Sequence, residues 1–198
     1  MNEIAVSQAK SQPMRFKPGV LDAVQQMGEQ FAGAALTVIP GGETLESQRD
    51  NGVIRFWTRW HFDPDEDPVI EPSIDSEVIY LPKVVPGTLR CSFDKTDADR
   101  LCVQEILDAL PKVEGLQWII GNAPTVNRVL ASHLQQTQGR EYLLRGEYTW
   151  TTDTYDSRYY GPTHLLVGYF HEYGVECTFL RPFPCHDHAW VFPLAVPA

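Results

Sequence analysis

The stretch that decides the fold is residues 163–181, THLLVGYFHEYGVECTFLR. Two runs rich in apolar and β-branched residues, 163–170 and 175–181, flank the short segment HEYG. Gly174 closes that segment and accepts the positive φ that a tight hairpin turn requires. The pattern therefore predicts two antiparallel strands joined by a short turn.

Outside this hairpin the chain alternates between further short strands and a few helices. Apolar, β-branched and aromatic runs predict strands at residues 35–39, 53–62, 78–81, 88–93, 116–120, 141–151 and 188–194. Apolar residues at helical spacing predict helices from Val20 to Phe31, over the stripe Val103 to Leu110 after a capping box at 96–99, and from Pro124 to Gly139. The helices do not alternate with every strand. We therefore expect an α+β fold with a mostly antiparallel sheet and about three helices segregated from the strands.

The length of 198 residues suits one domain, and 43% hydrophobic with 21% charged residues excludes wholesale disorder. Residues 1–13 are polar and predict a flexible N-terminal arm. Residues 14–198 are expected to form a single domain, with residues 63–77 as an acidic insertion loop. No stretch approaches the roughly 20 apolar residues of a membrane span, and no membrane partner is expected.

The formal net charge of −10 disfavours general binding to nucleic acid, whose phosphates it repels. The acid is concentrated in the predicted insertion loop, which contains no Lys or Arg: Asp63, Asp65, Glu66, Asp67, Glu71, Asp75 and Glu77. Such a patch suits a protein partner with a basic surface. Solubility alone is the simpler interpretation of the same charge.

A second candidate surface is the segment TTDTYDSRYYGP at 151–162, which is predicted to be a loop of about a dozen residues. Its Tyr155, Arg158, Tyr159 and Tyr160 are of the types that anchor protein interfaces. The alternative is that these tyrosines pack back on the sheet.

The segment CHDH at 185–188 contains thiolate, imidazole and carboxylate groups, all of which bind metals. On a strand His186 and His188 would point to one face, and His164 or His171 would supply a third ligand to zinc or iron. This predicts, as an alternative function, a metal-dependent hydrolase or oxygenase. The competing interpretation is a polar turn that leads into the last strand.

The predicted strand at 53–62 places four polar or aromatic side chains on one face: Arg55, Trp57, Arg59 and His61. Such a face suits a phosphate or a stacked base, which would make the protein a sensor of small anions or nucleotides. The alternative is that these cations pair with acidic side chains elsewhere in the chain.

Four cysteines without C-x-x-C spacing, behind an N-terminus that does not resemble a secretory leader, predict free thiols in a reducing cytoplasm. The sequence also lacks the P-loop, G-x-G-x-x-G, G-x-S-x-G and H-E-x-x-H patterns. The leading hypothesis is therefore a non-catalytic cytoplasmic binding protein without a cofactor, of the inhibitor or immunity-protein type. In this hypothesis the acidic residues speed association and the tyrosines carry the affinity.

Overall fold

The computed structural model describes residues 12–56, 69–89, 91, 93, 102–157, 161–179 and 189–198. In chain order the elements are α1 (Val20–Gln25), the 3₁₀ turn η1 (Glu29–Phe31), β1 (Ala35–Ile39), α2 (Leu45–Asp50), β2 (Ser76–Tyr80), α3 (Val103–Ala109), β3 (Leu116–Ile119), α4 (Ala123–Gln136), β4 (Tyr148–Ser157), β5 (Gly161–His171), β6 (Gly174–Phe179), β7 (Ala189–Trp190) and β8 (Leu194–Pro197).

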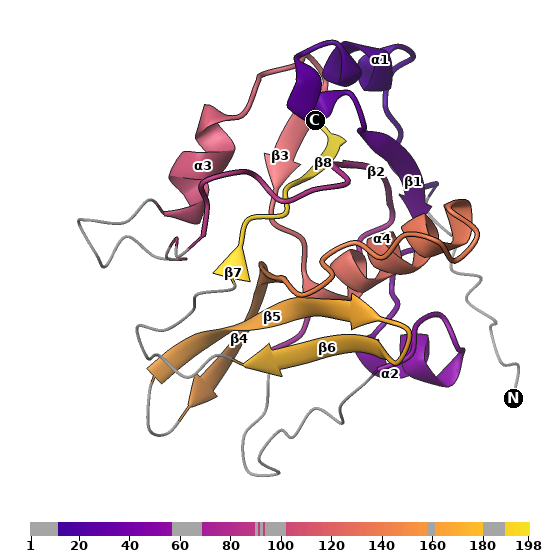
Figure 1. Ribbon diagram of the computed structural model, residues 1–198, viewed down its shortest axis with the longest axis vertical. Helices are drawn as coiled ribbons and strands as arrows, with labels where there is room; N and C mark the ends of the chain where they lie inside the picture. The colour runs from indigo at the N-terminus through magenta and orange to yellow at the C-terminus, as the bar shows by residue number, and fades with distance from the viewer. Residues whose placement is uncertain are drawn as a thin grey trace, which may run out of the picture.

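The strands form two four-stranded sheets rather than one (Figure 1). The first sheet has the order β1-β2-β8-β3 and the second the order β6-β5-β4-β7. All the pairs are antiparallel except β4 with β7, which is parallel. The predicted α+β class with mostly antiparallel strands is confirmed. Among the described helices, none combines the length and apolar character needed to cross a membrane.

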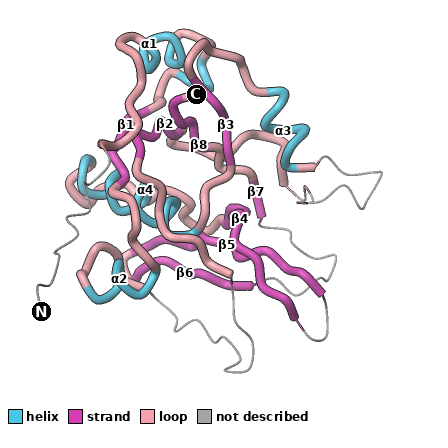
Figure 2. The backbone as a smooth tube through the Cα atoms, turned by 180° about the vertical axis from the view of Figure 1, so that it is seen from behind, coloured by secondary structure: helices cyan, strands magenta, loops and turns pink. Residues whose placement is uncertain are grey.

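Helix α4 lies between the two sheets, and one buried cluster joins all three (Figures 1 and 2). Val126 and Leu130 of the helix are fully buried in this cluster. Tyr80 comes to it from the first sheet, and Leu165 and Val167 come from the second. A helix that buries its apolar stripe against two sheets holds them in a single core.

A second cluster covers the opposite face of the first sheet. Because side chains alternate along a strand, Val78 and Tyr80 face α4 whereas Ile79 faces α1, η1 and α3. Both faces of this sheet are therefore covered.

The N-terminal third differs from the prediction at two places. The helix expected from Val20 to Phe31 ends at Gln25, because Gly28 has a φ of 137° and interrupts the helical path before η1. The polar segment 43–51, for which no helix is predicted above, contains α2. Its N-terminus is closed by a reciprocal capping box, in which the Thr44 hydroxyl accepts from Ser47 N–H and the Ser47 hydroxyl accepts from Thr44 N–H.

The strands predicted at 53–62 and 88–93 are not seen in the described part of either segment, and residues 57–62 lie outside the described residues. Residues 53–56 lie outside any strand, with only an isolated bridge between Phe56 and Val175. The described residues of 88–93 form local turns, in which Cys91 N–H donates to the Thr88 carbonyl. These turns use backbone groups that a strand would need.

The helix with the stripe Val103 to Leu110 is α3, and its N-cap is Cys102, whose N–H donates to the Glu105 carboxylate. The capping box expected at 96–99 lies outside the described residues, and the helix begins after it. Residues 1–11 of the expected arm also lie outside the described residues. The acidic segment ends within β2, because Ser76 and Glu77 belong to that strand.

Candidate functional site

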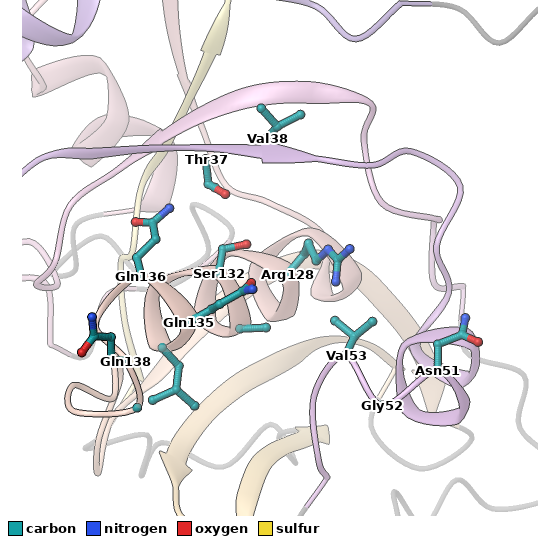
Figure 3. A pocket seen from close by; sticks show the side chains of 13 residues that line it. Thr37, Val38, Asn51, Gly52, Val53, Arg128, Ser132, Gln135, Gln136 and Gln138 are labelled. Carbon is teal, nitrogen blue, oxygen red and sulfur yellow. The ribbon is translucent and has the colours of Figure 1, made fainter.

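An open groove of about 920 Å³ lies between β1, α4 and the chain that follows α2 (Figure 3). This volume falls in the range of ligand-binding sites in proteins, roughly 300–1,000 Å³. The groove is lined by Thr37, Val38, Asn51, Gly52, Val53, Arg128, Ala131, Ser132, Leu134, Gln135, Gln136, Gln138 and Gly139.

The start of α4 is defined by its cap and its apolar stripe. The Asn122 side chain accepts from Thr125 N–H, and Pro124 occupies the first turn, where its missing N–H costs nothing. The same Asn122 side chain donates to the Glu71 and Pro72 carbonyls at 3.0 and 2.7 Å. The start of the helix is thereby tied to the chain that precedes β2.

The polar face of α4 forms one wall of the groove. Arg128, Ser132 and Gln136 are spaced four residues apart, so they lie in one row along the helix. Figure 3 shows this row beneath β1, with Gln136 reaching up toward the strand. Arg128 is paired with Glu43 at 3.4 Å.

Strand β1 forms the opposite wall and is an edge of the first sheet as described. Its Val38 is 52% exposed. The carbonyl oxygen of Leu36 is directed away from β2, because it accepts from Nε2 of Gln136 at 3.3 Å.

The far end of the groove is formed by Asn51, Gly52 and Val53, directly after α2. The buried Gln48 side chain donates to the Pro124 carbonyl at 2.7 Å, and this bond fixes α2 against the start of α4. Val53 N–H then donates to the Gln48 carbonyl at 2.8 Å. These bonds hold that end of the groove in place.

Behind Gln136 lies a buried polar chain. The Tyr80 hydroxyl is 3.1 Å from both Gln136 Oε1 and His133 Nδ1, and Nε2 of His133 is 3.5 Å from a Glu141 carboxylate oxygen. Burial raises the pKa of Tyr80 to about 12. Burial also lowers the pKa of His133, while Glu141 acts in the opposite direction.

The described lining residues supply mainly uncharged hydrogen-bonding groups. The lining consists of amides, hydroxyls, small apolar groups and the paired guanidinium of Arg128.

The Tyr-rich loop predicted at 151–162 is largely strand. Strand β4 continues to Ser157 and β5 begins at Gly161, because Thr and Tyr residues in this stretch favour strand conformation. Tyr155 lies on β4 opposite Thr163 and is half-buried. The other predicted partner-binding residues lie outside the described residues: Asp63, Asp65, Glu66, Asp67, Arg158, Tyr159 and Tyr160.

Two of the four predicted metal ligands are described. His164 lies on β5 and stacks on Phe93, with the two ring centroids 3.5 Å apart. Its Nδ1 contacts the Thr151 carbonyl. His171 ends β5, and its Nδ1 accepts from Tyr173 N–H. The described residues contain no cluster of three metal-ligating side chains. His186 and His188 lie outside them, so the metal hypothesis stays a prediction.

The predicted cationic strand face is described only at its start. Arg55 is exposed, and its carbonyl accepts from Val175 N–H at 2.9 Å. Trp57, Arg59 and His61 lie outside the described residues.

The groove was not predicted from the sequence. Its α4 wall has a readable signal, the row Arg128, Ser132 and Gln136 opposite the apolar stripe. Its β1 wall has none, because the sequence 35–39 is uncharged and resembles a strand buried on both sides.

The buried carboxylate of Asp153 was also missed. It is 2% exposed and accepts from Ala123 N–H at 2.5 Å and from Glu71 N–H at 3.0 Å. It thus fastens β4 to the first residue of α4 and to the chain before β2. Burial raises its pKa from 3.8 to about 6, against the opposing effect of the two backbone donors.

This shift predicts a pH dependence of stability. Because the pKa is higher in the folded protein, Asp153 binds its proton more tightly there than in the unfolded chain. Its favourable contribution to the free energy of unfolding is therefore complete below about pH 4. It is lost as the pH rises through about 6. The free energy of unfolding of the wild type minus that of Asp153→Asn should therefore fall between pH 4 and pH 7 in urea titrations. The exposed Asp108→Asn serves as the control, and a pH-independent difference for Asp153→Asn contradicts the prediction.

Comparison of the chain with protein-family models, with curated proteins and with solved structures finds no match.

Proposed function

We propose that the protein is a non-catalytic binding protein that holds a segment of a protein partner in the groove between β1 and α4. The observation that carries this proposal is the lining, in which amide and hydroxyl side chains from α4 face an exposed strand edge. Grooves bounded by a strand edge and a helix are a recurrent way to bind polypeptide segments.

The proposed partner has a basic surface, since the net charge of −10 accelerates association with such a protein. In this proposal the acidic residues between 63 and 67 act on the rate of association. The proposed location is a reducing cytoplasm. This is supported by Cys91, Cys102 and Cys177, which are buried free thiols.

The test is site-specific photo-crosslinking in cells that naturally contain the protein. A photoreactive amino acid replaces Gln135, which is exposed in the groove, or Tyr173, which is 61% exposed on the turn between β5 and β6. We expect a discrete protein adduct from position 135 and none from position 173.

A second variant makes the assignment specific to the groove. Ser132→Trp fills the groove from α4 and should abolish the adduct at position 135, while circular dichroism confirms an intact fold. The proposal fails if position 135 gives no adduct, if both positions give the same adducts, or if Ser132→Trp leaves the adduct unchanged.

A further inference from the structure

The side of β1 on which no described strand lies has a defined hydrogen-bonding pattern. Successive residues of an antiparallel strand direct their backbone groups to opposite sides. The Leu36 carbonyl points away from β2, because Gln136 donates to it. The backbone groups of Leu36 and Val38 therefore face away from β2, and those of Thr37 face toward it.

The Gln136 side chain satisfies one backbone acceptor on this side of β1. Its Nε2 donates to the Leu36 carbonyl as the backbone N–H of an added strand would. The bond of 3.3 Å is at the long end of the range and lies on an exposed side chain, so exchanging it costs little.

We propose that the partner segment binds as an extended strand, antiparallel to β1, that pairs with Leu36 and Val38 and displaces the Gln136 amide from the Leu36 carbonyl. This inference rests on the proposed function of the groove and names what the groove binds. The added strand extends the first sheet at its β1 edge.

The lining also limits the side chains of this segment. Among the described residues that line the groove, Arg128 alone is charged, and it pairs with Glu43. Backbone pairing therefore supplies the affinity, and uncharged side chains face Thr37 and Ser132. The opposite side of the added strand lies beside the exposed Val38, which favours an apolar residue there.

The displacement has a consequence at His133. In the structure Gln136 Nε2 donates to Leu36, so its Oε1 accepts the Tyr80 hydroxyl proton. Tyr80 has one proton to donate. Its contact with His133 Nδ1 therefore requires Nδ1–H to be the donor, and Nε2 of the neutral ring carries the lone pair.

These roles reverse when the Gln136 side chain leaves both the Leu36 carbonyl and the Tyr80 hydroxyl. The Tyr80 hydroxyl then donates to His133 Nδ1, one proton leaves Nδ1, and one proton is taken up at Nε2, beside Glu141. The titratable groups that face the ring are Tyr80 on β2 and Glu141 after α4. The tautomer of His133 thus reports whether Gln136 is hydrogen-bonded to the Leu36 carbonyl of β1.

The first arm of the test needs no partner. The tautomer of His133 is read from the nitrogen chemical shifts of its ring in the full chain. We expect Nδ1–H in the wild type and Nε2–H in Gln136→Leu, which cannot hold the Leu36 carbonyl. Gln135→Leu is the matched control in the same groove, because Gln135 has no role in the chain of contacts from Leu36 to His133, and it should give the wild-type tautomer.

The second arm uses dodecapeptides that are selected from a random library because they bind the full chain. A peptide is kept only if the Ser132→Trp variant fails to bind it. Methylation of the peptide backbone nitrogens should abolish binding at alternate residues only, because alternate residues face β1. Gln136→Leu should bind these peptides about three-fold to ten-fold more tightly, as expected for removing one competing hydrogen bond. Saturating peptide should convert His133 of the wild type to the Nε2–H tautomer.

The outcomes separate this inference from the proposed function. An alternating methylation pattern together with the tautomer change supports strand addition. A flat methylation pattern, or a tautomer unaffected by peptide or by Gln136→Leu, overturns strand addition and leaves the groove as a binding site. If the library yields no peptide whose binding is lost in Ser132→Trp, strand addition is overturned. If the crosslink at position 135 is also missing, the proposed function is overturned as well.

Discussion

Gly168→Ala is expected to lower the free energy of unfolding by about 3 kcal/mol or more, because there is no room for a side chain at this position. A Cβ at Gly168 would overlap the carbonyl oxygen of Glu147 and lie 2.6 Å from Cα of Tyr148. Both neighbours are backbone atoms of the adjacent strand segment, so neither can rotate away. The close approach lets the Glu147 carbonyl accept from Tyr169 N–H at 2.9 Å, beside the register shift in the β5–β6 pair.

The measurement is equilibrium unfolding in urea, followed by tryptophan fluorescence. Gly139→Ala is the control, since no atom lies within 4 Å of a Cβ there and only its φ of 77° opposes alanine. That conformational cost is about 1–2 kcal/mol. A Gly168→Ala variant as stable as the wild type would show that β4 and β5 are not this close.

Leu130→Ala is expected to lower the free energy of unfolding by about 2–5 kcal/mol, because apolar burial is lost and a cavity is left behind. Leu130 is fully buried on α4, in the cluster that both sheets share. The matched control on the same helix is Leu134→Ala, because Leu134 is only partly buried and packs at the margin of that cluster. Its loss should be smaller in the same urea titration. Equal losses at the two positions would contradict the placement of α4 between the sheets.

Helix α4 illustrates what local sequence can predict. Its cap, the proline in its first turn and its apolar stripe are all signals within a few residues of one another, and the predicted helix is confirmed. Helix α2 was missed because the segment LESQRD lacks an apolar stripe. The capping pair Thr44 and Ser47 was the available signal, with serine in place of the usual glutamate.

Pairing between distant strands could not be predicted in the same way. The bounds of β1 follow from its sequence, but its position at the edge of the sheet depends on which strand lies beside it. The bounds of β4 were predicted wrongly: residues 141–147 lie outside the strand, and its polar second half, which resembles a loop, is strand. That half is held by contacts far along the chain, such as those of Asp153 with Glu71 and Ala123.

The order of strands in the first sheet bears on how the protein is made. Strand β8 lies between β2 and β3, yet it follows both of them, and all of the second sheet, in the chain. During synthesis the paired strands β1 and β2, and then β3, therefore emerge from the ribosome without the strand that joins them. Residues 194–197 must leave the exit tunnel before the first sheet closes, so its completion is a late event that waits on translation.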